Sequence, residues 1–262
     1  MSTIHEMALS GLPLNGFEII DSHSHLGHIS HFNNSCCTAE YLLKNMDAMG
    51  VSSACISTAL AIDVNYKAGN DLMIETITKY PERFHGFLVI NPHFPEDIQP
   101  EIERCLKFKG VRGIKLHPAG HNCMPDYKNY HLVYEKAQEH KLPMLIHTWG
   151  SADLEAIDRL APLYPDASFI MGHSGAYLRS MEDAIDLANK YDNVYGDLAI
   201  SLAYEGNVEW FVKEMGSHKV LYGTDMPYFS PTPNFSRVAL ADISDEEKRN
   251  VLGRNIKKLL KL

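Results

Sequence analysis

Eight short apolar segments, separated by helix-like segments, are the feature of this 262-residue chain that most restricts its fold. The segments are rich in Val, Ile and aromatic residues and are apolar along nearly their whole length. This pattern is typical of parallel strands that are covered on both faces. The segments span residues 17–21, 53–58, 84–90, 111–117, 143–148, 168–173, 194–198 and 219–225. Such alternation is compatible with a closed (β/α)8 barrel or an open doubly wound sheet.

The segments between the expected strands carry the start and stop signals of helices. Apolar residues recur at helical spacing between positions 98 and 106, and Ser151 is expected to cap the start of a helix. Residues 244–247 read Ser-Asp-Glu-Glu, a capping box that predicts the start of the last helix. Gly253 is expected to break or bend that helix. The sequence shows no linker, low-complexity segment or repeat, so it predicts one domain over residues 1–262.

Phosphate-binding motifs do not support the open sheet. No G-x-G-x-x-G pattern follows the first apolar segment, and the chain has no G-x-x-x-x-G-K-[ST] pattern. These absences weaken a nucleotide-binding version of the open sheet. Periodicity alone does not separate the open sheet from the barrel.

The charge balance restricts the partners that this chain can have. Its formal net charge is −9, which argues against nucleic acid or an anionic membrane surface. A small anionic substrate is still compatible, because a few basic residues in a pocket can override the overall field. The chain has no C-x-x-C pair, no signal-peptide start and no apolar stretch near the ~18 residues of a membrane span. We therefore expect a cytoplasmic protein that acts on a small molecule, as a monomer or a homo-oligomer.

Polar side chains occur at the ends of several apolar segments. His23 and His25 follow the first segment two residues apart, so in an extended chain they point the same way. The other segment ends carry Lys115 and His117 (fourth), His147 (fifth), His173 (sixth), Asp197 (seventh) and Asp225 (eighth). In a parallel barrel all of these ends meet at one rim, which is where active sites of this architecture lie.

Each of these residues has an ordinary explanation when it is taken alone. A single His-x-His is usually a surface feature, and His147 alone is more often a core histidine with a hydrogen-bond partner. Asp225, which precedes Met226-Pro227, fits the start of a turn. Together they favour a shared ion, because buried polar groups are costly without partners. Imidazole and carboxylate ligands suit Zn²⁺, Mn²⁺ or Fe²⁺, with zinc the default for hydrolysis.

The order of these residues resembles the amidohydrolase superfamily. The segments IIDSHSHLG, GIKLHP, LIHTWG, GHSGA and YGTDMPY resemble its amidohydrolase-2 branch more narrowly. That branch includes aminocarboxymuconate-semialdehyde-decarboxylase-like enzymes, aromatic acid decarboxylases and lactonases. The closing segment VLGRNIKKLL is similar to the last helix of that group, and the resemblance runs from about residue 17 to the C-terminus. It implies a single metal-dependent (β/α)8 barrel.

The resemblance also implies roles for individual residues. One divalent metal would be held by His23, His25, His147 and Asp225, with His173 as an acid/base or substrate-polarising group. Superfamily members with two metals use a carboxylated lysine at the place of Lys115, so a second metal would follow if Lys115 is carboxylated. We favour the alternative, in which Lys115 is an ammonium that binds a substrate carboxylate. His117 and Arg179 are further candidates for substrate binding.

These roles lead us to expect a hydrolase that acts on a lactone, amide or related bond of a small carboxylate-bearing substrate. The metal would activate a water, and Asp225 would carry its proton to the leaving group. The alternative is non-oxidative decarboxylation of a small aromatic or unsaturated acid, with Asp225 or His173 protonating the carbon. A non-catalytic metal-binding protein is a third hypothesis, but His173 and Asp225 exceed what ligation alone requires.

Overall fold

Eight parallel strands pair in chain order in the computed structural model, which describes residues 3–30, 32–34, 36–199 and 204–262. The strands are β1 Ile20–Leu26, β2 Ser53–Thr58, β3 Phe84–Val89, β4 Val111–Leu116, β5 Pro143–His147, β6 Ser168–Gly172, β7 Val194–Asp197 and β8 Val220–Leu221. Backbone hydrogen bonds from β1 to residues after β8 close the sheet: Ser22 N donates to Tyr222 O, and His25 N donates to Met226 O. The predicted (β/α)8 barrel is confirmed.

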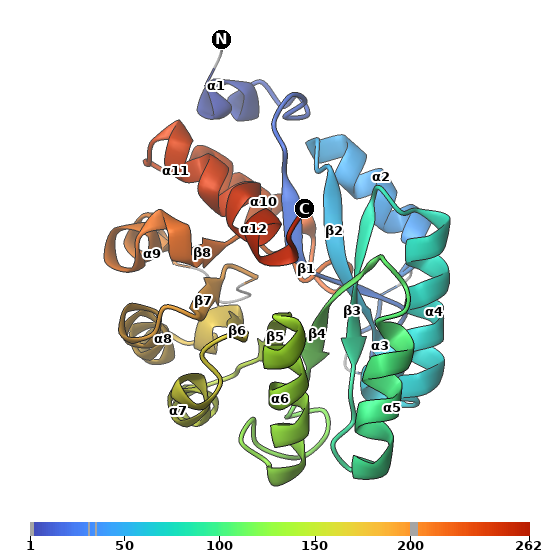
Figure 1. Ribbon diagram of the computed structural model, residues 1–262. Helices are drawn as coiled ribbons and strands as arrows, with labels where there is room; N and C mark the ends of the chain where they lie inside the picture. The colour runs from blue at the N-terminus through green and yellow to red at the C-terminus, as the bar shows by residue number, and fades with distance from the viewer. Residues whose placement is uncertain (1–2, 31, 35, 200–203) are drawn as a thin grey trace.

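The helices form a ring around the strands (Figure 1). They are α1 Ile4–Leu9, α2 Ala39–Met49, α3 Ala59–Asp63, α4 Tyr66–Lys79, α5 Pro95–Cys105, α6 His131–His140, α7 Ser151–Leu160, α8 Leu178–Lys190, α9 Asn207–Met215, α10 Pro231–Leu240, α11 Asp245–Arg249 and α12 Asn255–Leu260. Helix α1 lies outside the ring and packs on α10. None of the helices in the described ranges is long and apolar enough to cross a membrane.

The two ends of the sheet depart from the strand boundaries that the sequence predicts. Strand β1 begins at Ile20 rather than at residue 17 and continues through both histidines, because His25 pairs with Ser57 of β2. Strand β8 ends at Leu221 rather than at residue 225. Asp225 has a positive φ of 58°, which takes the chain out of the extended conformation. Apolar runs therefore located these two strands but misplaced their ends.

Three positions at which the sequence predicts a helix start or break have different outcomes in the structure. Ser244 and Glu247 form the expected capping box at the start of α11. Gly253 lies in a π-helical turn between α11 and α12, where a side chain would clash with the carbonyl oxygen of Glu18. The N-cap prediction for Ser151 is wrong: Gly150 caps α7, and the Ser151 hydroxyl donates to Asp183 instead.

Inward-facing side chains fill the barrel in two layers. We call one the lower layer, in which an apolar residue from each of six strands packs against Ile256 and Leu260 of α12: Ile20, Cys55, Phe87, Leu145, Ile170 and Leu221. Further along the strands, and in the turn after β8, a second set of side chains lies toward the carboxyl end of the barrel. This upper layer consists of His23, His25, Ser57, Lys115, His147, Asp197 and Asp225. Both layers are buried apart from the half-buried His147, and the upper one is polar.

Candidate active site

A compact group of two histidines and one carboxylate occupies the carboxyl end of the barrel. His23, His25 and Asp225 each offer a ligand atom, and these atoms lie within 4.8 Å of one another. Asp225 Oδ1 is 3.2 Å from His25 Nε2 and 3.6 Å from His23 Nε2. Both histidines come from β1, and the turn after β8 brings Asp225 beside them, where Asp225 N donates to His23 O. Neutral imidazoles and a carboxylate are a donor set that suits a divalent transition metal.

The far nitrogen of each β1 histidine has a polar partner. His23 Nδ1 lies 2.7 Å from Asp197 Oδ2, and His25 Nδ1 lies 2.9 Å from Ser57 Oγ. Such partners fix the ring orientation and turn the lone pair of Nε2 toward Asp225. Burial lowers the pKa of both imidazoles well below the usual range, so both stay neutral and keep a lone pair. The arrangement therefore fits a bound divalent metal.

Lys115 places a cation beside this group. Its side chain is fully buried, and Nζ lies 2.8 Å from His23 Nε2. Burial lowers the pKa of Lys115 to about 8, while the charges of Asp225 and Asp197 oppose that shift. Burial also raises the pKa of Asp225, and the charges of His173 and Lys115 act in the opposite direction.

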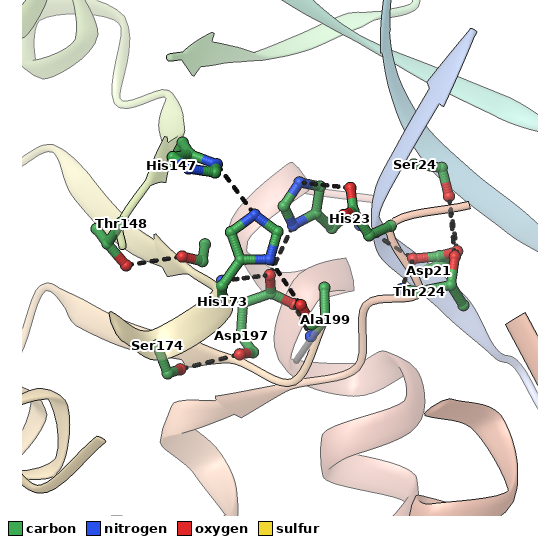
Figure 2. A network of polar contacts seen from close by, with 12 residues as sticks. Asp21, His23, Ser24, His147, Thr148, His173, Ser174, Asp197, Ala199 and Thr224 are labelled. Carbon is green, nitrogen blue, oxygen red and sulfur yellow. Dashed lines mark hydrogen bonds and ion pairs between the residues drawn. The ribbon is translucent and has the colours of Figure 1, made fainter. Parts of the chain in front are cut away.

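The imidazole rings of His147 and His173 are joined by a hydrogen bond (Figure 2). His173 Nδ1 lies 2.6 Å from the carbonyl oxygen of Ala199, so that nitrogen must carry a hydrogen. His173 Nε2 is therefore an acceptor, and His147 Nδ1, 3.1 Å away, donates to it. This leaves His147 Nε2 with a free lone pair. The compact group does not include His147, the fourth predicted ligand, which lies on the other side of His173 from His23 (Figure 2).

Asp197 connects His23 to His173, a role that the sequence did not reveal. It accepts hydrogen bonds from His23 Nδ1 and from the backbone N–H groups of His173 and Ala199. Burial raises its pKa to about 7. The position of Asp197 at the end of β7 was the available signal, because the other site residues also follow strand ends. Its partners could not be read from that position alone.

An aromatic-walled cavity of about 80 Å³ lies over these groups. Its lining residues are His25, Ile29, Phe32, Ile62, Lys115, His117, His147, Trp149, His173, Asp225, Tyr228 and Phe229. Lys115 is the single Lys or Arg among them. Arg179, which the sequence suggested for substrate binding, is exposed on α8 and does not line this cavity. Helix α8 starts at Leu178, and its first turn leaves Arg179 at the surface.

Comparison with known proteins places the chain in a family. A family model described as Amidohydrolase matches residues 20–262. The chain therefore belongs to the amidohydrolase family.

Relatives of this amidohydrolase-family chain are named decarboxylases. A gamma-resorcylate decarboxylase from a Polaromonas species is 22% identical over 274 residues, covering 85% of this chain and 83% of the relative. One from Rhodococcus jostii is 22% identical over 256 residues, covering 77% and 78%.

Solved structures share the fold. A putative amidohydrolase from Staphylococcus aureus superposes with a TM-score of 0.78 at 18% identity, covering 94% of this chain and all of the other. A manganese-containing 5-carboxyvanillate decarboxylase from Novosphingobium aromaticivorans has a TM-score of 0.73 at 18% identity, covering 94% and 97%.

The names of these relatives contradict the expectation of a hydrolase. That expectation came from ligand motifs, which hydrolases and decarboxylases of this family share. The motifs predict a metal group but do not specify which bond is broken. The decarboxylase alternative agrees better with the relatives.

Proposed function

We propose that this protein is a metal-dependent decarboxylase of a small aromatic acid. The observation that carries the proposal is the cavity, which joins aromatic walls to a His-His-Asp group and a single buried cation. Aromatic walls suit a flat ring, and Lys115 suits a carboxylate. The relatives named gamma-resorcylate decarboxylase support the same reaction.

His23, His25 and Asp225 would hold the metal, with His147 Nε2 as the fourth donor. A bound divalent metal would chelate the substrate carboxylate and offset its negative charge. Manganese gains support over zinc here, because the argument for zinc rested on hydrolysis and a neighbouring decarboxylase structure contains manganese. Mixed nitrogen and oxygen ligation is compatible with either ion.

Two residues of β4 and the following loop would orient the substrate. Lys115 would bind the carboxylate as an ammonium and would remain uncarboxylated. His117 Nδ1 accepts the Gly120 backbone N–H at 2.9 Å, so the ring hydrogen of a neutral His117 is on Nε2 and can be donated to the substrate. A carbamate carbon signal in ¹³C NMR of protein equilibrated with ¹³C-bicarbonate would contradict the proposed state of Lys115.

Asp225 is the proposed proton donor. When the bond between the ring and the carboxylate breaks, CO₂ departs and the bonding electron pair stays on the ring carbon. That carbon gains a proton from the Asp225 carboxyl group, which solvent later reprotonates. His173 is less suited to this step, because its Nε2 accepts a hydrogen bond from His147 and its Nδ1–H is held by Ala199 O.

A product screen tests the proposal. Metal-loaded protein would be incubated with lactones, amides and aromatic carboxylates, including 2,6-dihydroxybenzoate, while CO₂ release and hydrolysis are recorded separately. We expect CO₂ release from at least one hydroxylated benzoate and no hydrolysis of the other compounds. Hydrolysis without CO₂ release from any of the acids would overturn the proposal.

A further inference from the structure

Strand β1 contains one residue more than its neighbour β2 between the lower and upper layers of the barrel. Ile20 of the lower layer pairs with Ser53, and His25 of the upper layer pairs with Ser57. The step is therefore five residues along β1 (25 − 20) and four along β2 (57 − 53). Two residues of β1 lie opposite one of β2, which defines a β-bulge.

This bulge turns the β1 histidines toward the centre of the barrel. Successive side chains of a regular strand point to opposite faces, so counting by two from Ile20 would bring the intervening serines inward. The extra residue reverses that alternation. As a result His23 and His25, rather than the serines, face Asp225 inside the barrel. The histidine half of the candidate metal group therefore depends on the bulge.

Asp21 holds the bulge from within. Its side chain is fully buried, and the pairing with β2 changes register between Asp21 and Ser24. Asp21 Oδ1 accepts the backbone N–H of His23 at 3.0 Å, and Oδ2 accepts the Ser24 hydroxyl at 2.7 Å. Because a buried backbone N–H needs a partner, a side chain that supplies one inside the bulge stabilises the bulged conformation.

The same carboxylate fastens the turn that carries Asp225. Asp21 Oδ1 also accepts the backbone N–H of Thr224 at 3.1 Å, and the Thr224 hydroxyl donates to Oδ2 (Figure 2). Thr224 Oγ1 in turn accepts the backbone N–H of Met226 at 3.0 Å. Asp225, with its positive φ of 58°, lies between these two residues. One buried carboxylate thus bonds both segments that supply the compact group.

We propose that Asp21 is a positioning residue for the metal ligands, which holds the bulge that turns His23 and His25 inward and fastens Thr224 so that Asp225 lies beside them. This inference rests on the metal group of the proposed function and adds the residue that sets its geometry. A buried aspartate with a purely structural role would affect stability alone. A positioning role also affects the metal affinity of the folded protein.

Metal titration of four variants tests the inference. Asp21→Asn replaces the carboxylate, Thr224→Val removes the hydroxyl that Asp21 accepts, and Thr224→Ser keeps that hydroxyl. The matched control is Glu101→Gln, because Glu101 is also a buried carboxylate that accepts several side-chain hydrogen bonds, but on α5 and away from the cavity. Dissociation constants for Mn²⁺ and Zn²⁺ are measured by calorimetry on the metal-free full chain. Urea unfolding of the metal-free proteins measures stability separately, and circular dichroism verifies folding.

We expect the metal dissociation constant to rise about 10-fold to 100-fold in Asp21→Asn, the loss that is typical when a group that orients a metal ligand is removed. Thr224→Val should raise it about 10-fold, and Thr224→Ser should stay close to wild type. Glu101→Gln should unfold at a lower urea concentration than wild type but bind metal as tightly. If Asp21→Asn does not fold, the comparison of Thr224→Val with Thr224→Ser decides.

Three results would overturn the inference. The first is wild-type metal affinity in folded Asp21→Asn or in Thr224→Val. The second is an equal loss of affinity in Glu101→Gln, which would show that lower stability alone weakens binding. The third is that wild type binds neither ion.

Recording CO₂ release from hydroxylated benzoates by metal-saturated wild type separates this inference from the proposed function. Release of CO₂, with unchanged metal affinity in Asp21→Asn and Thr224→Val, would leave the proposed function standing and remove the role of Asp21. Weakened metal binding in both variants, without CO₂ release from any of the acids, would do the reverse.

Discussion

The lower and upper layers of the barrel are built by the same strands and differ in what they bury. The lower layer contains apolar side chains such as Phe87 and Ile170, packed beneath α12. Toward the carboxyl end of the barrel, the upper layer buries histidines, carboxylates and Lys115, none of them more than about a third exposed and most of them fully buried. Burying charged groups this way lowers stability unless they are paired. The difference indicates that one layer stabilises the fold and the other is arranged for binding and chemistry.

The two layers also differ in the backbone φ angles in and beside them. Asp225 of the upper layer has a positive φ of 58°, and so has His173, at 67°, which hydrogen-bonds to His147 of that layer; non-glycine residues rarely adopt such angles. Such strained residues cluster at functional sites, where the surrounding structure holds them in place. No residue of the lower layer has a positive φ. The upper layer therefore combines backbone strain with buried charge.

Replacing Asp225 of the upper layer should have the largest effect on activity with the smallest effect on stability. Asp225→Asn keeps the shape of the side chain and one ligating oxygen but removes the proton donor. We expect kcat for decarboxylation to fall at least ~10²-fold, with metal binding partly retained and the free energy of unfolding within about 1 kcal/mol of wild type, because the isosteric change creates no cavity. Steady-state kinetics and urea unfolding measure the two effects. Full activity in Asp225→Asn would move the proton-transfer role to His173.

The opposite result is expected in the lower layer. Leu260 is 98% buried where α12 closes the barrel, so Leu260→Ala should cost about 2–5 kcal/mol in the free energy of unfolding. The rate per folded molecule should stay within about twofold of wild type, because Leu260 belongs neither to the cavity lining nor to the His-His-Asp group. A large loss of kcat in Leu260→Ala at temperatures where the protein is fully folded would break the division between layers.

A pH effect on stability should come from His85, near the start of β3. Burial lowers its pKa to about 4, with Arg112 adding to the shift, whereas an unfolded histidine titrates near 6.5. Between these values the unfolded chain binds more protons, so this group's contribution is fully present above pH 6.5 and is lost as the pH falls toward 4. The loss is about 3 kcal/mol.

Urea unfolding of wild type and His85→Gln from pH 4 to 7 measures that contribution. The difference between the two proteins should change by about this amount across the range, because glutamine does not titrate. A difference that is constant with pH would show that His85 does not have the depressed pKa. Other titrating groups are common to both proteins and cancel in the comparison.

The sequence predicted the fold well because the barrel follows from a repeated physical signal. Buried parallel strands must be apolar along their length, and eight such runs were visible. The approach of Asp225 to His23 and His25 also follows from strand ends meeting at one rim. The C-terminal end of β1 was misplaced because polar site residues interrupt the apolar signal that marks a strand, and the end of β8 was misplaced because no sequence pattern marks the turn at Asp225.

Other features of the site depend on contacts that no local pattern encodes. Asp197 looked like any strand-end aspartate, and its bonds to His23 and His173 arise from three different strands meeting. Arg179 follows His173 closely in sequence, but helix α8 places it at the surface. The choice between hydrolysis and decarboxylation depends on the shape and lining of the cavity, which the ligand motifs do not specify.

Metal content of the purified protein tests the central claim most directly, because the whole account of the upper layer depends on an ion held by β1. Elemental analysis for manganese, zinc and iron would compare wild type with a His23→Ala, His25→Ala double variant. A second double variant, His5→Ala with His140→Ala, removes two exposed histidines as a control. We expect about one equivalent of divalent metal in wild type and in the control, and less than a tenth of that in the site variant. Full metal retention in the site variant would contradict the account.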